Sequence, residues 1–489
     1  MIKKHDRQKN EKGRNDPRAQ AALPIDPAVK ARQFQTLRGM KDVFGEDQHR
    51  WFLLEKEARR SAEDYGFQWM ETPMLEESAL FVKTIGRGTD IVDQEMFSFE
   101  TQGGEKVSLR PENTAAMVRA YIQHGMWTQP QPVKLWYWGP FFRYDRPQAG
   151  RLREFHQLGF EVLGDASPLA DALLMIQAVE LLGSIGITVD VELNSIGCTT
   201  CRPTYIEQLT QYYREHRSSI CAECKKRLGK NVLRVLDCKE RGCERIKAEA
   251  PQSVDALCEA CKDHFMRLLE YLDERDVPYM LQPTLVRGLD YYTRTVFEIV
   301  VREPEAAAAS GAAPASKLAL AGGGRYDGLV EFLGGRPTPG LGIAFGIERV
   351  IHAVRNAAST VPEPVEKRVF VAQLGEAARR SALKLFGKLR QQGIPVAHSF
   401  SKDGLKAQLE VANALKVPYT LIVGQKEVLD HTVLIRDMEG GVQEIVAEDR
   451  LISELQRRLS ELNGVKAVRV PAPPIEPDEP LDPEDIEVL

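Results

Sequence analysis

The chain has 489 residues, of which 43% are hydrophobic and 28% charged, and its formal net charge is −5. A chain of this length is expected to form about two or three domains. The negative charge argues against a protein that simply coats nucleic acid, but it does not exclude one local basic face. The sequence contains no apolar run of about 18 residues, so no membrane span is predicted.

Residues 1–36 are polar and charged and lack apolar periodicity, which predicts a disordered arm. No apolar stretch follows the basic start, so it is not a secretory signal. Asp6, Glu11 and Asp16 lie among the basic residues and argue against a transit peptide. We therefore expect a cytoplasmic protein.

Apolar residues at helical spacing predict a helix over Trp51–Tyr65. Residues 67–75 are strand-like, with Pro73 suited to a strand end or edge. Val133–Phe142 predicts a second strand, which forms a long antiparallel hairpin with 155–164.

Ser167 and Pro168 suit the N-cap and first position of a helix that is predicted to continue to Leu182. The same patterns predict strands at 189–193, Thr295–Arg302 and Ala319–Gly322, and a helix at 346–354. Residues 303–317 form a low-complexity stretch that we expect to be a mobile loop.

Beyond a proline-containing linker at 361–366, strands and helices alternate, which predicts a small, mainly parallel α/β domain over 366–465. Its elements are expected at 369–374, 377–392, 394–399, 404–415 and 419–424. Residues 470–489 are acidic and proline-rich and should not fold alone.

All eight cysteines fall between residues 198 and 261, which indicates an inserted cysteine-rich subdomain over 198–275. They form three C-x-x-C pairs and one wider pair: Cys198/Cys201, Cys221/Cys224, Cys258/Cys261 and Cys238/Cys243. In a cytosolic chain this spacing indicates metal binding before disulfides, and eight thiols suit two structural zinc sites of four cysteines each. Scattered buried thiols are the alternative, but they would not repeat the C-x-x-C spacing. The pairing into sites stays open.

The sequence has no P-loop, no H-E-x-x-H and no G-x-S-x-G motif. If the protein handles a nucleotide, arginines on a sheet are the physical alternative, because a guanidinium matches phosphate oxygens bidentately and keeps its charge. Arg143, Arg287 and Arg349 lie in or after strand-like or glycine-rich runs. The glycine runs 321–328 and 340–346 let backbone approach a ligand, or simply form tight turns.

Together these stretches resemble histidyl-tRNA synthetases, a family of class II aminoacyl-tRNA synthetases, over about residues 37–459. Residues 67–75 resemble motif 1, 142–164 motif 2, and 340–349 motif 3, while R-G-L-D-Y-Y-T at 287–293, A-G-G-G-R-Y-D-G at 321–328 and L-R-P-E-N-T at 109–114 resemble the histidine-specific stretches. The resemblance implies an α+β catalytic domain with an antiparallel sheet over 37–360. It also implies a C-terminal α/β anticodon-binding domain and a homodimer formed through motif 1.

The resemblance further implies that the carboxylate of L-histidine attacks the α-phosphate of ATP, with Mg²⁺, and that the histidyl group then moves to tRNA(His). It assigns Arg143 to the α-phosphate, Arg349 to the γ-phosphate, and Arg287 to the α-phosphate and the substrate carboxylate. The residues matched to histidine binding are Glu112, Asn113, Thr114, Arg143, Gln157, Glu161, Arg287, Tyr291, Tyr292 and Tyr326. Asn113 stands where the family more often has glycine. Core packing is the alternative role for the tyrosines.

Residues 225–247 hold nine Lys or Arg against three Asp or Glu. This basic stretch is either a solvated face or a contact for the acceptor arm of tRNA, whose affinity would fall with salt. Two other functions compete with the ligase: a synthetase-like regulatory subunit of histidine biosynthesis and a non-catalytic tRNA or histidine sensor. Both would tolerate loss of the arginines, which this chain retains.

Overall fold

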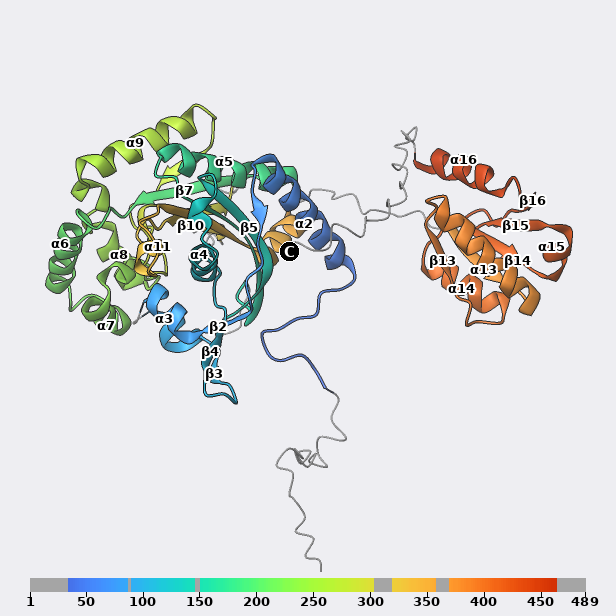
Figure 1. Cartoon of the computed structure of the whole chain (residues 1–489), viewed down its shortest axis with the longest axis horizontal. Helices are drawn as coiled ribbons and strands as arrows, with labels where there is room; N and C mark the ends of the chain where they lie inside the picture. Colours follow the sequence, from blue (N-terminus) through green and yellow to red (C-terminus); the bar gives the residue numbers. More distant parts are fainter. Residues whose placement is uncertain (1–33, 87–88, 146–149, 303–318, 358–368, 464–489) are drawn as a thin grey trace, which may run out of the picture. The chain divides into compact units, whose positions relative to one another are not determined.

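The computed structural model describes residues 34–86, 89–145, 150–302, 319–357 and 369–463. Nearly all of the predicted arm, the 303–317 loop, the 361–366 linker and the acidic tail lie outside these residues. The chain divides into two compact units, Met1–Val361 and Pro362–Leu489, which are described separately (Figure 1).

An eight-stranded sheet forms the centre of the first unit. In spatial order its strands are β1 (Gln68–Trp69), β5 (Val133–Phe142), β6 (Glu154–Leu163), β11 (Gly340–Gly346), β10 (Ala319–Arg325), β9 (Thr293–Val301), β7 (Val189–Ser195) and β8 (Tyr279–Leu281). The six inner strands pair antiparallel, whereas β1 and β8 pair parallel at the two edges. The predicted antiparallel catalytic sheet is therefore confirmed.

The predicted hairpin is also confirmed, because β5 has the predicted bounds and β6 returns beside it. Helices α2 (Glu46–Asp64), α5 (Pro168–Ser184) and α12 (Ile347–Asn356) match predicted helices. At the start of α5, Ser167 accepts a hydrogen bond from the backbone N–H of Ala170 at 3.4 Å, as an N-cap does. Apolar residues of the sheet and of these helices form the largest core.

The prediction of one strand over 67–75 was wrong. Only Gln68–Trp69 joins the main sheet, and β2 (Leu75–Glu77) belongs to a second sheet with β4 (Lys106–Leu109) and β3 (Ser98–Glu100). Pro73, between them, has no N–H to donate to a ladder. The carbonyl of Thr72 instead accepts a hydrogen bond from Arg110 Nη1 at 2.7 Å, so the chain passes from one sheet to the other here.

The cysteine-rich insertion lies between β7 and β8 and is helical. It contains α6 (Arg202–Glu215), α7 (Ala222–Lys230), the 3-10 turn η3 (Val232–Val235), α8 (Arg241–Ala248), the 3-10 turn η4 (Ser253–Ala256) and α9 (Glu259–Asp273). A small core of apolar and cysteine side chains holds the first three helices together. Helix α9 then packs beside α5, which returns the chain to the main sheet (Figure 1).

Shorter helices complete the first unit: α3 (Ser78–Ile85), the π-helical η1 (Ile91–Glu95), α4 (Thr114–Gln123), the 3-10 turn η2 (Met126–Thr128) and α11 (Leu329–Phe332). Among the described residues of both units, no helix is long and apolar enough to cross a bilayer.

The second unit is a five-stranded sheet covered by helices. Its strands are, in order, β13 (Val396–His398), β12 (Val369–Gln373), β14 (Tyr419–Val423), β15 (Thr432–Asp437) and β16 (Gln443–Ala447). Helices α13 (Glu376–Gln391), α14 (Leu405–Ala414), α15 (Gln425–Asp430) and α16 (Leu451–Asn463) accompany them. The first three strands are parallel, as predicted, and β15 and β16 add an antiparallel hairpin that the sequence patterns did not predict.

Candidate active site

Three arginines converge on the central sheet of the first unit. Arg143 follows β5 and donates through Nε to the carbonyl of Pro111 at 2.9 Å. Arg349, on α12, donates through Nη1 to the carbonyl of Ala319 at 3.0 Å. Burial lowers the pKa of Arg349, and repulsion from Arg151, Arg143 and Arg287 lowers it further. This repulsion is the kind that a bound polyanion would offset.

Arg287 lies at the same site but has its own acidic partner. Its guanidinium forms an ion pair with Glu298 of β9. Burial lowers the pKa of Arg287, but Glu298, Tyr292 and Tyr291 together outweigh burial and raise it. The side chain keeps 21% exposure, and its Nε has no hydrogen-bond partner among the described residues. A buried N–H without a partner in a charged site is a place where a ligand oxygen can bind.

A second group of predicted residues forms one hydrogen-bonded cluster. Glu112 accepts bonds from the backbone N–H groups of Thr114, at 2.7 Å, and Ala115, at 3.0 Å, at the start of α4. The Thr114 hydroxyl donates to Glu161 at 2.7 Å, and the Tyr326 hydroxyl donates to the other Glu161 oxygen at 2.5 Å. This cluster connects α4, β6 and the chain just after β10.

Two tyrosines of the R-G-L-D-Y-Y-T stretch complete the cluster. The Tyr291 hydroxyl lies 3.4 Å from Glu112 Oε2, and its ring centre is 5.8 Å from that of Tyr326. The ring of Tyr292 lies 4.8 Å from that of Tyr291 and packs in a small apolar core with Ile196. Tyr292 therefore has a packing role as well as a place beside the site.

Glu161 is 1% exposed, and its ionisation is strongly perturbed. Burial raises the pKa of Glu161 to about 8, although the hydrogen bonds from Tyr326 and Thr114 oppose the rise, and the nearby Glu112 adds to it. Below that pH Glu161 is therefore a neutral carboxylic acid, which can both donate and accept a hydrogen bond.

Two predicted residues differ from the rest. Asn113 turns away from the cluster, because its Oδ1 accepts a bond from the Thr72 hydroxyl at 2.6 Å. Gln157, on β6, has a buried Oε1 that lacks a partner among the described residues. This unpartnered oxygen fits a group that accepts a ligand N–H. Asn113 Nδ2 is also buried without a partner among the described residues.

Glycines provide the space for these side chains. A Cβ atom added at Gly342 would overlap the carboxylate of Glu161, and one added at Gly340 would overlap the ring of Tyr326. A Cβ at Gly322 would lie 2.5 Å from both terminal nitrogens of Arg287. The glycine runs lie in strands β10 and β11 and leave room for functional side chains, a role that neither interpretation of those runs considered.

Sequence reasoning missed two residues of the site. Glu298, the partner of Arg287, is an acidic residue in the otherwise apolar end of β9. Tyr137, on β5, lies directly across the strands from Gly159, whose missing side chain makes room for its ring. An acid in an apolar strand and a glycine opposite an aromatic residue are the signals that could have found them.

The eight thiols are free and gather in two sets of four, each with its sulfur atoms within 4.8 Å of one another. We call Cys198, Cys201, Cys258 and Cys261 set 1, and Cys221, Cys224, Cys238 and Cys243 set 2. The closest sulfur pairs are 3.7–3.9 Å apart in set 1 and 3.8–3.9 Å apart in set 2. A tetrahedron with Zn–S bonds of about 2.3 Å has S···S edges of about 3.8 Å, so both sets fit a zinc ion.

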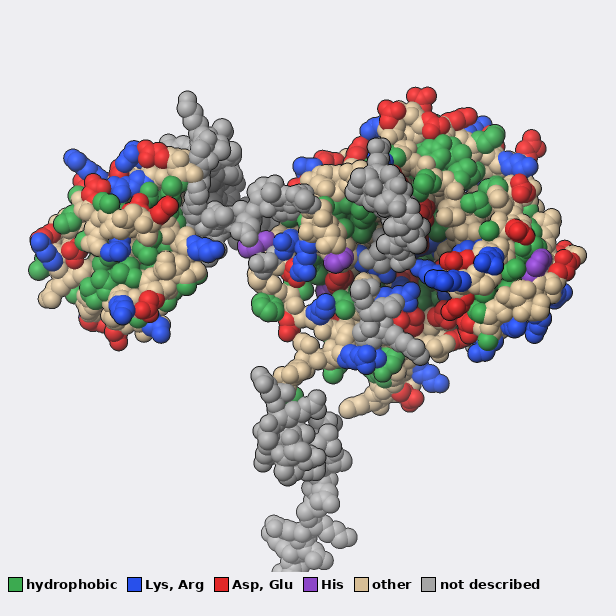
Figure 2. All heavy atoms as spheres, turned by 180° about the vertical axis from the view of Figure 1, so that it is seen from behind, with side chains coloured by type: hydrophobic (Ala, Val, Ile, Leu, Met, Phe, Trp, Pro, Cys, Tyr) green, Lys and Arg blue, Asp and Glu red, His purple; other side chains and the backbone are tan. Residues whose placement is uncertain are grey.

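Three residues of the basic stretch 225–247 bind aspartates near η1 in the same unit. Arg234 and Arg227 donate to Asp90 at 3.0 and 3.3 Å, and Lys230 donates to Asp93 at 3.4 Å. These three side chains dock the insertion onto the segment around η1, a role that neither interpretation of the stretch considered. On the face shown in Figure 2, acidic and basic side chains are interspersed over both units.

Comparisons with known proteins agree with this geometry. The family "Histidyl-tRNA synthetase" matches residues 39–350, and "Anticodon binding domain" matches residues 368–458. The antiparallel sheet with its arginines and the C-terminal anticodon-binding domain define a class II aminoacyl-tRNA synthetase. The chain belongs to the histidyl-tRNA synthetase family.

Individual relatives give the same result over nearly their full lengths. The histidine–tRNA ligase of Dehalococcoides mccartyi is 44% identical over 427 residues, which cover 87% of this chain and 100% of that protein. The histidine–tRNA ligase of Pelotomaculum thermopropionicum is 42% identical over 86% of this chain and 97% of its own length. The apo histidyl-tRNA synthetase of S. aureus has a TM-score of 0.71 at 30% identity, covering 86% of this chain and 99% of its own.

Proposed function

We propose that this chain is a histidine–tRNA ligase in which Arg143, Arg287 and Arg349 bind ATP and the Glu112–Glu161 cluster binds histidine. Membership of the family and the 44% identical ligase support the activity. The observation that carries the residue roles is the placement of Arg143 after β5, of Arg287 against Gly322 of β10, and of Arg349 against the start of β10, on the same sheet as the Glu112–Glu161 cluster. The retained arginines and the anticodon-binding domain favour a ligase over a regulatory subunit or a sensor.

In the first step, a carboxylate oxygen of histidine attacks the α-phosphorus of ATP, and diphosphate leaves. Catalysis of such a step depends mainly on positioning and on stabilising charge. Arg143 and Arg287 would bind the α-phosphate, with Arg287 also oriented toward the histidine carboxylate, and Arg349 would bind the γ-phosphate. Phosphate charge would offset the mutual repulsion that lowers the pKa of Arg349. Mg²⁺, when bound, would neutralise charge on the phosphates.

In the histidine pocket, the two carboxylates would have different roles. Glu112 would attract the ammonium group of histidine together with Thr114 and Gln157. Burial raises the pKa of Glu112 despite its two backbone N–H bonds, and the bound ammonium would favour its charged form. Glu161, with its raised pKa, would pair with an imidazole nitrogen, because a neutral imidazole needs both a donor and an acceptor. Tyr291 and Tyr326 would enclose the ring.

Histidine-dependent exchange of diphosphate into ATP tests this proposal. Folded protein should catalyse exchange, and Arg287→Ala should abolish exchange while histidine binding stays measurable by calorimetry. Absence of exchange with the folded wild-type chain would disprove the ligase. Unchanged exchange in Arg287→Ala would disprove only the role of that arginine.

The second step would transfer the histidyl group to tRNA(His). The match to an anticodon-binding domain supports tRNA recognition by the second unit. In the basic stretch, Lys239, Arg241 and Arg245 are exposed, and we assign them to the acceptor arm. Lys226 pairs with Glu223, and Arg227, Lys230 and Arg234 pair with aspartates. Replacing Lys239, Arg241 and Arg245 with alanine should reduce the salt dependence of tRNA binding; an unchanged slope would refute the contact.

A homodimer would cover an exposed apolar region at the β1 edge of the main sheet. Trp69 is 57% exposed, and Met74 and Leu75 are 49% and 44% exposed. Large exposed apolar side chains on β1 and on the chain that leads into β2 favour a protein partner, and a second copy fits because motif 1 lies here. Sedimentation should show a dimer for the wild type and a monomer for Trp69→Ser. A monomeric wild-type chain would exclude this assembly.

Each thiol set would hold one structural Zn²⁺, since its sulfur separations match a tetrahedral site. Eight free thiols also favour a reducing compartment, so we place the enzyme in the cytoplasm. Metal analysis should find two zinc ions per chain, and a chelator should lower the melting temperature. Purified protein that lacks zinc and melts unchanged with chelator would refute the metal sites.

A further inference from the structure

Set 1 lies at the base of the insertion, where the chain enters and leaves. Cys198 and Cys201 follow β7, while Cys258 caps α9 and Cys261 lies in its first turn. A metal here would join both ends of the insertion to the edge of the main sheet. Any role for this metal rests on the zinc sites proposed above.

Arg202, the residue after Cys201, links set 1 to the histidine-specific stretch. Its guanidinium donates to the carbonyls of Ile196 at 3.2 Å, Gly197 at 3.0 Å and Tyr292 at 2.5 Å. These three bonds from one side chain fix the backbone of Tyr292 against the turn that contains the first two thiols. Because the charge of Arg202 is shared among carbonyl oxygens, each bond is of the stronger, charge-assisted kind.

Arg294 is bound to the same turn through its backbone. Its N–H donates to the carbonyl of Gly197 at 2.9 Å, and its carbonyl accepts from the N–H of Ile196 at 2.8 Å. Arg294 has a φ of 50°, a left-handed conformation that costs a non-glycine residue free energy. The contacts with the Gly197 turn offset this cost, at a position two residues beyond Tyr292.

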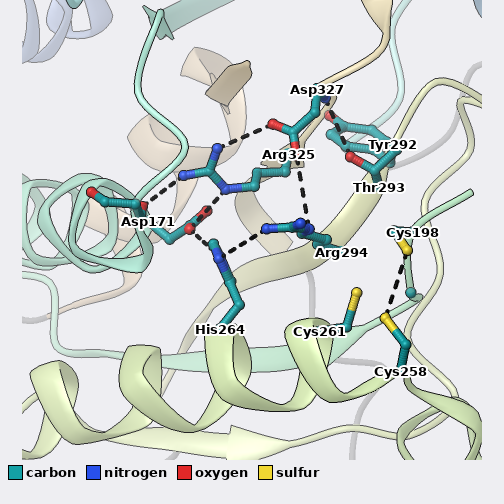
Figure 3. Close-up of polar contacts among 12 residues, drawn as sticks. Asp171, Cys198, Cys258, Cys261, His264, Tyr292, Thr293, Arg294, Arg325 and Asp327 are labelled. Atoms are coloured by element: carbon teal, nitrogen blue, oxygen red, sulfur yellow. Dashed lines mark hydrogen bonds and ion pairs between the residues drawn. The ribbon is translucent and has the colours of Figure 1, made fainter. Parts of the chain in front are cut away.

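Helix α9, which carries Cys261 of set 1, contacts the side chain of Arg294 through His264 (Figure 3). On α9, His264 follows Cys261 by nearly one turn and lies on the same face of the helix. Arg294 Nη1 donates to His264 Nδ1 at 3.3 Å, so Nε2 carries the proton and donates to Asp171 at 2.7 Å. Asp171 is fully buried and also pairs with Arg325 at 2.9 Å.

We propose that the metal of set 1 positions the histidine pocket, by holding the Gly197 turn and helix α9 against the Tyr291–Arg294 segment. The pocket residue Tyr326 follows Arg325, so both histidine-specific stretches join this network. Without the metal, four thiols at this separation no longer have a common ligand, and the two ends of the insertion separate. The direct result is a loosened Tyr292 backbone rather than a lost phosphate contact.

Set 2 makes a different connection. It holds α7 and α8 in the small core of the insertion. Residues 228–234 face the histidine-specific stretch across a cavity of about 360 Å³, and Asn231 reaches Asp290 at 2.8 Å. The Asn231–Asp290 bond joins two side chains, whereas the links from set 1 fix the backbone of Tyr292 and Arg294. Loss of the metal from set 2 should therefore leave histidine binding nearly unchanged.

Three variants separate these roles. Cys198→Ser/Cys201→Ser removes set 1, the matched Cys221→Ser/Cys224→Ser removes set 2, and Arg202→Met keeps both sets but breaks the link to Tyr292. The measurements are zinc per chain by mass spectrometry, and histidine and ATP dissociation constants by calorimetry. We expect one zinc ion in each double cysteine variant and two in Arg202→Met.

The set 1 variant and Arg202→Met should bind histidine about tenfold more weakly, the scale of one lost charge-assisted hydrogen bond. Their ATP affinity and the histidine affinity of the set 2 variant should stay within about twofold of wild type. Arg202→Met carries the test if the set 1 variant does not fold. Two zinc ions with unchanged histidine affinity in Arg202→Met would overturn the coupling but leave the metal sites standing. Absence of zinc from the wild type would overturn both the metal sites and the coupling. Equal losses of histidine affinity in the set 1 and set 2 variants would overturn the coupling.

Discussion

Gly322→Ala gives the sharpest test of the placement of Arg287. Gly322 lies directly across the sheet from Glu298, the acidic partner of Arg287. The new Cβ would lie 2.5 Å from both terminal guanidinium nitrogens, so Arg287 must retreat by about 0.9 Å to reach the 3.4 Å of ordinary contact. A misplacement of about 1 Å at a reacting centre typically costs about 100-fold in rate. We therefore expect histidine-dependent diphosphate exchange to fall about 100-fold.

A glycine of the same stretch provides the control. A Cβ added at Gly328 would have no atom within 4 Å, and Gly328 has no positive φ, so Gly328→Ala should exchange diphosphate like the wild type. Both variants should keep the wild-type melting temperature to within a few degrees, since neither changes the core of the sheet. Full exchange activity in folded Gly322→Ala would refute the assigned position of Arg287, and an equal loss in both variants would refute the steric reasoning.

Three further predictions concern stability. The pKa of Glu161 is raised from 4.5 to about 8 in the folded state, so the folded chain binds more protons and its unfolding free energy should fall as pH rises from 4.5 to 8. Urea titrations across that range should show a fall of about 2–5 kcal/mol that Glu161→Gln removes, and a flat wild-type profile would contradict the raised pKa. Arg325→Met leaves Asp171 buried without its arginine and should cost about 3–5 kcal/mol by urea unfolding; a loss below about 1 kcal/mol would count against the pair. Gly183→Ala, in α5 with nothing within 4 Å, should stabilise the chain by about 0.5 kcal/mol, and destabilisation would contradict the open space around this position.

The sequence predicted the elements whose own residues determine their form. The hairpin of β5 and β6 follows from two long apolar runs around a polar turn, and α5 follows from its N-cap and first-position proline. Residues 67–75 failed as one strand because the passage between two sheets depends on Arg110, which lies far along the chain. The β15–β16 hairpin was missed because much of β16 is exposed and has no strong apolar pattern.

The active site was predicted as a set of residues but not as an arrangement. Resemblance supplied Glu112, Thr114 and Glu161, and the structure brings them together from α4 and β6. Glu298 could not be found in this way, because its role depends on pairing with Arg287 across the sheet. The division of the thiols into two sets was likewise open, since spacing alone does not say which pairs meet in space.

All four cysteines of set 2 lie, along the chain, between the two cysteine pairs of set 1, and this order also bears on how the chain folds. Strands β7 and β9 are neighbours in the sheet, with Asn194 opposite Val296, yet the whole insertion separates them along the chain. Cys198 and Cys258 are 60 positions apart and meet at its base. A metal bound there would join the two ends of the insertion, so that only a short connection would separate β7 from β9. This would lower the entropic cost of pairing the two strands. The insertion could then change in length or sequence while β7 and β9 kept their register in the sheet on which histidine would bind.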